Sequence, residues 1–158
     1  MDLNPQLFNE VVQPTQADYP AMSRVISRCL REVNSRDYPS EVINKLVDLY
    51  SPDNLAQVLE GSFCIVVRRR GELIGTGVLT GTEIRTVFVL PHLQRSGIGR
   101  MIMQALEKEA MRQGLKEVAL HASLTSVLFY KKLGYQPVGQ VDREVGGEST
   151  FMVKELSG

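Results

Sequence analysis

A short segment with two glycines, residues 94–100, is the part of this sequence best suited to chemistry. Gly97 and Gly99 lie between a predicted strand and a predicted helix. Glycine lets a ligand approach the backbone closely, and the N–H groups at the start of a helix, with the helix dipole, attract phosphate oxygens. Arg95 and Arg100 can add charge-assisted hydrogen bonds to the same phosphates. The segment therefore predicts a cradle for a phosphate-bearing ligand.

Two common phosphate-binding loops do not match this segment. A Walker loop requires Lys and then Ser or Thr directly after its last glycine, whereas Arg100 and Met101 follow Gly99 here. A dinucleotide-binding fingerprint has Gly or Ala where Ile102 stands. The loop must therefore serve another class of phosphate ligand.

The elements that must position this segment follow a clear order along the chain. Apolar residues at helical spacing predict one helix through Met22 and Leu30, with others at 40–50, 55–59, 97–113 and 127–133. Alternating or β-rich runs predict strands at 8–13, 63–67, 73–79, 83–90, 118–121, 135–141 and 150–153. A turn is predicted at Gly146 and Gly147. This order predicts a mixed sheet with helices on its faces.

Length and composition predict one globular domain, residues 1–158. The chain has 43% hydrophobic and 23% charged residues, which is enough for a sizeable core. Its 18 basic and 18 acidic residues cancel, so the sequence lacks the positive charge of a general nucleic-acid binder. We therefore expect no nucleic-acid partner.

The sequence also predicts a soluble, cytoplasmic protein without a metal. No apolar run approaches the roughly 18 residues that cross a bilayer, and residues 1–5 lack the basic and apolar regions of a leader peptide. Cys29 and Cys64 are isolated in apolar surroundings, with no zinc-site or disulfide spacing. We expect both to be small core residues and expect no membrane association.

Two motifs together resemble the GNAT superfamily of N-acetyltransferases. Residues 94–99 are similar to the family's acetyl-CoA signature, which has Gln or Arg first, then Gly, and then Gly or Ala. Residues 123–135 are similar to its N-x-x-A-x-x-F-Y-x-x-x-G element, with Ser123 and Ser126 in place of the usual Asn and Ala. The resemblance implies a mixed, mostly antiparallel central sheet of about six to seven strands with helices on both faces.

The resemblance implies that acetyl-CoA is the ligand. In such folds the strand that carries Val87, Phe88 and Val89 separates from its neighbour, so its backbone N–H and C=O groups pair with pantetheine as an added strand would. A freed N–H there can also donate to the thioester oxygen. Ordinary strand burial is the alternative for these three residues. Further CoA contacts are assigned to Gln94, Arg95, Ser96, Gly97, Ile98, Gly99, Arg100 and Ser123.

Tyr130 is the candidate general acid. The resemblance places it where the family protonates the departing CoA thiolate. A phenol has a pKa near ~10 and an alkyl thiol near ~8.5, so the proton transfer requires close positioning or local tuning. The structural alternative is a tyrosine packed beside Phe129 with its hydroxyl hydrogen-bonded.

Glu83 and His121 are the candidate general bases, because an ammonium acceptor must lose a proton before it attacks. Glu83 lies near the start of the cofactor strand, in a register where some family members keep a glutamate base. It could instead pair with a nearby Arg or Lys. His121 titrates near neutral pH when unperturbed, although a lone His in an apolar strand is more often a satisfied core residue. Water is a third route for the proton.

The sequence therefore favours an N-acetyltransferase that moves the acetyl group of acetyl-CoA to a primary amine by direct attack. The acceptor is expected to be a small molecule or a peptide. A non-catalytic acetyl-CoA sensor or interaction module is one alternative, and an acyltransferase that uses a longer acyl-CoA is the other. A homodimer is left open, since many members of the family dimerise.

Overall fold

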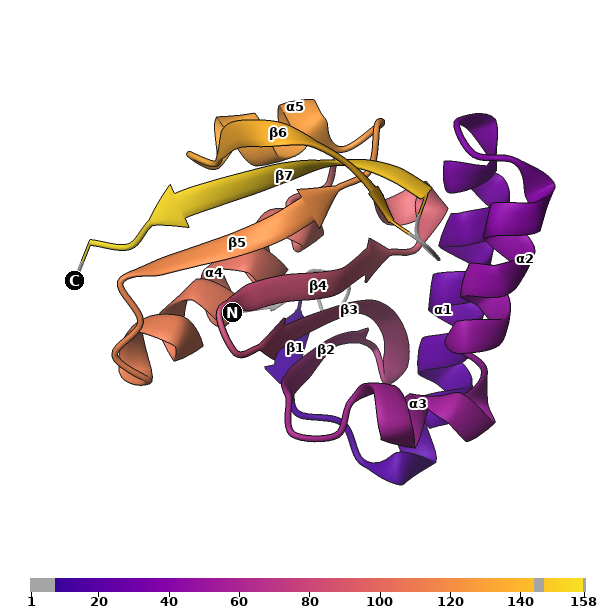
Figure 1. The fold of residues 1–158 in the computed structure, drawn as a ribbon. Helices are drawn as coiled ribbons and strands as arrows, with labels where there is room; N and C mark the ends of the chain where they lie inside the picture. Colours follow the sequence, from indigo (N-terminus) through magenta and orange to yellow (C-terminus); the bar gives the residue numbers. More distant parts are fainter. Residues whose placement is uncertain (1–7, 144–146, 158) are drawn as a thin grey trace.

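The computed structural model of the chain describes residues 8–143 and 147–157, so residues 1–5 and Gly146 of the predicted turn lie outside it. Within these ranges seven strands form one sheet in the order β1-β2-β3-β4-β5-β7-β6 (Figure 1). Neighbouring strands pair antiparallel except β4 and β5, which run parallel. The mixed, mostly antiparallel sheet is confirmed. The strands are β1 (Asn9–Val12), β2 (Phe63–Arg69), β3 (Glu72–Thr80), β4 (Glu83–Val89), β5 (Glu117–Ala122), β6 (Gln136–Arg143) and β7 (Gly147–Glu155).

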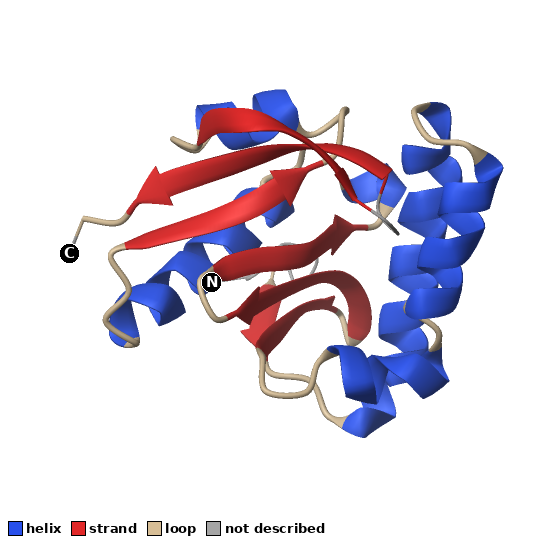
Figure 2. Ribbon diagram, in the orientation of Figure 1, coloured by secondary structure: helices blue, strands red, loops and turns tan. Residues whose placement is uncertain are grey.

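Helices cover both faces of this sheet (Figure 2). In Figure 1, α1 and α2 lie side by side, and α4 crosses behind the strands. The α1 stripe predicted through Met22 and Leu30 is buried, as expected for an amphipathic helix that packs on a sheet. The helices are α1 (Tyr19–Glu32), α2 (Ser40–Leu49), α3 (Pro52–Val58), α4 (Ile98–Arg112) and α5 (Val127–Lys132).

The central strand β3 is buried on both of its faces, because α1 packs on one and α4 on the other. Two glycines bring α4 unusually close. A Cβ added at Gly77 would overlap Cγ2 of Ile102, and one added at Gly75 would lie 3.0 Å from Cδ1 of the same side chain. This close packing holds the first turn of α4 beside the end of β4, where the candidate site lies.

The order of elements predicted from the sequence is the observed order, and most boundaries agree within two residues. The structure adds three 3₁₀ turns to the described part of the chain: η2 (Gln16–Asp18), η3 (Asn34–Arg36) and η4 (Pro91–Leu93). Cys29 and Cys64 are buried and free, as predicted. The described helices are each too short or too polar to cross a lipid bilayer.

Candidate active site

The site is centred on a gap between β4 and β5. The two strands begin together, with Glu83 opposite Ala119 and the Ala119 N–H donating to the Thr82 carbonyl at 2.9 Å. That is the one pair of residues that joins them in the described chain. Beyond it the strands separate, as the family resemblance implied, and the facing edge of β4 is left without a neighbour.

A β-bulge in β4 accompanies this separation. The pairing of β3 with β4 shifts between Thr76 and Val78, and Thr86 has a φ of +57°, which is rare for a β-branched residue. The Thr76 hydroxyl donates to the Thr86 carbonyl at 2.7 Å, and the Tyr50 hydroxyl lies 3.2 Å from Thr86 Oγ1. These two contacts hold the strained residue in place, since such a conformation persists only where its surroundings impose it.

Beyond the bulge, the three residues assigned to pantetheine differ in what they offer. The Leu90 N–H donates to the Ile74 carbonyl at 2.9 Å, so by the alternation of an antiparallel ladder the N–H and C=O of Val89 point into the gap. The backbone groups of Phe88 point toward β3 instead, and its ring lines the cleft at 6.1 Å from the Tyr50 ring. Val87 also lines the cleft.

The Val89 carbonyl is already used within the protein. It accepts a hydrogen bond from the buried Cys29 thiol at 3.0 Å and another from Gln94 Nε2 at 3.2 Å. By the ladder alternation given above, the Val89 N–H points away from β3 and into the gap. The donor on this edge therefore faces the gap, and Gln94 holds the end of β4 through the carbonyl.

The loop before α4 presents a series of free donors. The backbone N–H groups of residues 95–100 donate to no group in the described part of the chain. Arg95 and Gly97 have φ values of +65° and +91°, and such left-handed residues curve a loop so that its N–H groups converge. The Arg95 and Arg100 side chains are exposed, and both residues line the cleft. The loop thus has the backbone form that the predicted anion cradle requires, and its binding of an anion stays a prediction.

Glycine is required at positions 97 and 99 of this loop for two different structural reasons. A Cβ at Gly97 would meet nothing within 4 Å, so the residue is required by its positive φ. A Cβ at Gly99 would lie 3.0 Å from Cζ of Phe129, so this glycine makes room for α5. Ser96 donates its hydroxyl to the Leu93 carbonyl, and the Ile98 side chain is buried in the core. These two residues therefore offer the cradle their backbone N–H groups.

One cleft of about 630 Å³ joins the loop, the gap and both predicted catalytic regions. Its walls come from α1, α2, β4, β5, the loop before α4, and α5. Glu83, His121, Ser123 and Tyr130 all line it. Elements far apart in the sequence thus bring the predicted site residues to a single cavity, except Ser96 and Ile98, which do not line it.

Tyr130 has the features of a proton donor that faces this cleft. Its side chain is 8% exposed, with the Phe129 and Tyr135 rings edge-on at 5.0 and 5.8 Å. Burial raises the pKa of the Tyr130 hydroxyl, so the group keeps its proton well above neutral pH. The hydroxyl makes no hydrogen bond to the described residues. Among the buried side-chain polar atoms of the described residues, Arg68 Nε alone lacks a partner, so the Tyr130 hydroxyl oxygen is open to the cleft.

Glu83 and His121 lie on neighbouring strands and face the same cleft. Glu83 is partly buried and makes no ion pair with the described residues, so the predicted alternative of a pairing with Arg or Lys is not observed there. His121 Nδ1 lies 3.3 Å from the Ser149 hydroxyl, and its ring is 5.1 Å from that of Phe151. Both residues line the cleft, and their role as general bases stays a prediction.

Ser123, which replaces the usual Asn, uses its hydroxyl within its own loop. The hydroxyl is hydrogen-bonded to that of Ser126, and the Ser126 N–H donates to the Ser123 carbonyl at 2.9 Å. Ser126 is the N-cap of α5. Both departures from the family motif thus lie in one serine pair that starts the helix of Tyr130.

Tyr38 is a cleft residue that the sequence did not single out. Its hydroxyl donates to the Glu148 carbonyl at 2.6 Å and accepts from the Leu124 N–H at 3.2 Å. It therefore joins the start of α2, the loop before α5, and β7. No local sequence signal marks this role, because its partners are 86 and 110 residues away.

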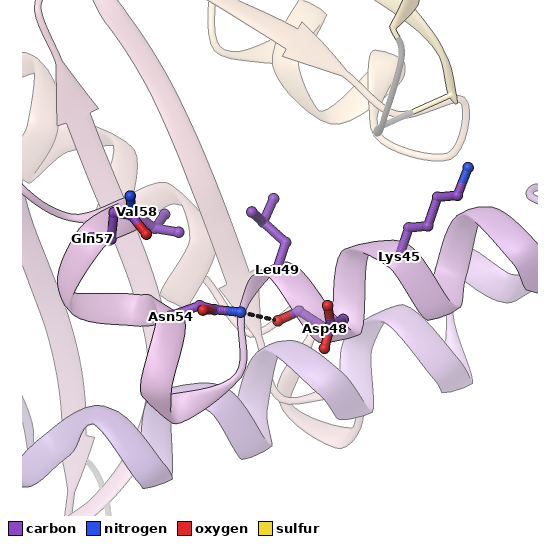
Figure 3. A pocket seen from close by; sticks show the side chains of 6 residues that line it. All are labelled: Lys45, Asp48, Leu49, Asn54, Gln57 and Val58. Atoms are coloured by element: carbon purple, nitrogen blue, oxygen red, sulfur yellow. Dashed lines mark hydrogen bonds between the residues drawn. The ribbon is translucent and has the colours of Figure 1, made fainter.

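A second hollow, of about 500 Å³, lies between α2 and α3 (Figure 3). It is open, and at its lining Asn54 Nδ2 donates to the Asp48 carbonyl at 2.8 Å. No group of three or more His, Cys, Asp or Glu side chains in the described chain could hold a metal ion. The predicted catalytic residues, Tyr130 and Glu83, line the larger cleft instead.

A family model described as an acetyltransferase (GNAT) domain matches residues 34–156. This chain belongs to the GNAT acetyltransferase family. The uncharacterized protein YyaT of Bacillus subtilis (strain 168) is 31% identical over 97 residues, which are 59% of this chain and 66% of that protein. Alignments to three further curated relatives span 41% to 50% of their lengths.

Solved structures share the GNAT fold over almost the whole chain. A GCN5-related N-acetyltransferase from Rhodopseudomonas palustris, named Aminotransferase, Class-II, superposes with a TM-score of 0.88 at 20% identity, covering 96% of this chain and 98% of that one. The PaiA N-acetyltransferase from Thermoplasma acidophilum, solved with coenzyme A, gives 0.78 at 18% identity over 94% and 99%. At these identities the likeness concerns the fold.

Proposed function

We propose that the protein transfers the acetyl group of acetyl-CoA to a primary amine of a small molecule or a peptide. One observation carries this proposal: a single cleft contains the open edge of β4, the free N–H groups of residues 95–100 and the unpartnered hydroxyl of Tyr130. Such a cleft suits a ligand with a diphosphate at one end, an extended amide arm and a reactive group beside a proton donor.

The residues present fit acetyl-CoA. The N–H groups of residues 95–100 and the Arg95 and Arg100 guanidinium groups would bind the diphosphate. The Val89 N–H would pair with an amide of the pantetheine arm, against the Phe88 ring and Val87. The serine pair that includes Ser123 would line the far side of the arm.

The proposed reaction is a direct acyl transfer. The neutral amine nitrogen attacks the thioester carbon, an N–C bond forms, and the C–S bond then breaks. The proton lost by the amine passes to Glu83 or His121, directly or through water, and the sulfur takes the Tyr130 proton, which solvent replaces. The products are an N-acetylated amine and CoA.

Tyr130 also favours an enzyme over a sensor that only binds acetyl-CoA. Binding alone has no need of a hydroxyl that lines the cleft and is hydrogen-bonded to no described residue, whereas protonation of a departing thiolate requires such a group. A longer acyl group is the remaining alternative for the donor. Propionyl-CoA and succinyl-CoA therefore belong in the first assays beside acetyl-CoA.

A thermal melt with and without acetyl-CoA tests the proposal first, with NAD and ATP as controls. Binding to the folded state at a hundred times Kd adds about 2.7 kcal/mol to the free energy of unfolding. For a domain of this size the melting temperature then rises by about 5 to 10 °C. Thiol release with a panel of amines follows, and it separates a transferase from a sensor. No shift at millimolar acetyl-CoA would contradict both.

We also propose the setting in which the protein works. Residues 1–158 act as a single domain in the cytoplasm, without nucleic-acid or membrane partners. A homodimer is compatible with this reaction, since all the proposed catalytic residues come from one chain. Size-exclusion chromatography with light scattering would give the oligomeric state.

A further inference from the structure

Arg85 is a charged side chain in the cleft that the proposed reaction does not use. It lies on β4, two residues after Glu83, and both residues line the cleft. Side chains two apart on a strand point to the same face. Even so, no ion pair or hydrogen bond joins Arg85 to Glu83 or to another described residue.

Arg85 differs in this respect from the other partly buried arginines that the structure describes. Arg68 pairs with Asp18 at 2.7 Å, and Arg69 Nε donates to Asn9 Oδ1 at 2.9 Å. A guanidinium is always charged, so partial burial without an anion is unfavourable. The protein itself supplies polar partners for the guanidinium groups of Arg68 and Arg69. The positive charge of Arg85 is left for a ligand in the cleft to neutralise.

Tyr38 links two segments that border the cleft. Its hydroxyl joins the Glu148 carbonyl and the Leu124 N–H, as described above. Gly147 packs on the same side chain so closely that an added Cβ would lie 3.1 Å from Tyr38 Cδ1. These contacts tie the segment before α2 to β7 beside a cleft of about 630 Å³, a size typical of small-molecule sites.

We propose that the acceptor is a small amine that carries a carboxylate, and that Arg85 binds this carboxylate. The planar guanidinium matches a carboxylate with two parallel hydrogen bonds. The amine would then face Glu83, His121 and the thioester, while the carboxylate remains unreacted. This inference rests on the proposed function, because it assigns the acceptor of that same reaction.

Three compounds of matched shape test the inference: lysine, lysinamide and 1,5-diaminopentane. Lysinamide replaces the carboxylate by a neutral amide, and the diamine lacks the group altogether. Lysine offers one amine next to its carboxylate and another far from it. Alanine, alaninamide and ethylamine form a second, shorter series. We expect kcat/KM for the carboxylate-bearing member of at least one series to exceed that of both partners by about tenfold or more.

The Arg85→Gln variant identifies the residue responsible. It should abolish this preference mainly through KM, while turnover of the diamine stays within about twofold of the wild type. Arg24→Gln is the matched control, since Arg24 is exposed on α1, lies outside the cleft and makes no described ion pair. This control should keep the full preference.

Three outcomes would overturn the inference. The amide or the diamine could be as good a substrate as the carboxylate, or the preference could survive in Arg85→Gln. If the enzyme turns over neither series, binding to the CoA-saturated protein is measured instead. Equal affinities for the carboxylate, the amide and the amine of a series would then also overturn the inference. Failure of the proposed function has a different signature, because acetyl-CoA then leaves the melting temperature of both wild type and Arg85→Gln unchanged.

Discussion

At the scale of single residues, the burial of Tyr130 has two opposite consequences for its role as an acid. A raised pKa makes the phenol a weaker acid, which disfavours full transfer of its proton. The same shift keeps the proton in place over the whole neutral pH range, and the low polarity around it strengthens its hydrogen bond to a developing thiolate. Positioning is therefore what makes this tyrosine useful.

We predict that Tyr130→Phe lowers kcat about a hundredfold or more, since a positioned general acid contributes about 10² to 10⁴. The loss should be equal across neutral pH, because the raised pKa means that the hydroxyl does not titrate there. Stability should change little, since the removed hydroxyl has no described partner. Steady-state thiol release, followed from about pH 6 to 8, measures the loss of kcat. Urea melts measure the free energy of unfolding.

Tyr135→Phe provides the matched control. The Tyr135 hydroxyl donates to Glu107 Oε2 at 2.7 Å, outside the cleft, and Lys154 also binds that carboxylate at 2.8 Å. Its removal should lower the free energy of unfolding by about 1 to 2 kcal/mol and leave kcat unchanged. A Tyr130→Phe enzyme with wild-type kcat would remove the residue from the mechanism.

At the scale of elements, the sequence predicts what depends on local patterns. The apolar stripe and Gly97 predict where α4 begins, and they do so correctly. The bulge at Thr86 has no such signal, because a β-branched residue with positive φ contradicts its own preference and is held by Tyr50 and Thr76. The separation of β4 from β5 was predicted from the family resemblance and not from a local pattern. The position of Tyr38 in the cleft was predicted from neither, because its contacts are long-range.

The loop before α4 allows a paired test of the anion cradle. Gly97 and Gly114 stand just before and after α4, with φ of +91° and +84° and nothing within 4 Å of an added Cβ. Alanine at either position should cost about 1 to 2 kcal/mol of stability through backbone strain alone. We predict that Gly97→Ala alone raises KM for acetyl-CoA, by about tenfold, because it reorients the free N–H groups.

Both variants must be compared by melting and by acetyl-CoA titration. Equal stability losses would show that the backbone cost is matched. Equal KM values for acetyl-CoA in Gly97→Ala and Gly114→Ala would then mean that the N–H groups of this loop do not bind the diphosphate. The loop would serve only to begin α4.

At the scale of the whole molecule, the family match and the fold divide the chain differently. The match begins at residue 34, after α1, whereas α1 packs on β3 and β4 and its Cys29 thiol donates to the Val89 carbonyl at the cleft. If residues 1–158 form one domain, α1 must unfold together with the sheet. If α1 is an accessory, it can leave while the sheet remains folded.

The two cysteines report on this question, because Cys29 lies in α1 and Cys64 in β2. They are 2% and 9% exposed, and burial raises the pKa of each thiol to about 12. The thiolate is the reactive form, so a thiol reagent should label neither at neutral pH until the surrounding structure opens. With Cys64→Ala leaving Cys29, and Cys29→Ala leaving Cys64, each labelling midpoint in urea should coincide with the circular dichroism midpoint of the same variant. Labelling of Cys29 at urea concentrations well below that midpoint, with Cys64 still protected, would show that α1 detaches first. The end of β4 would then lose the hydrogen bond from Cys29 to the Val89 carbonyl while the sheet is still folded.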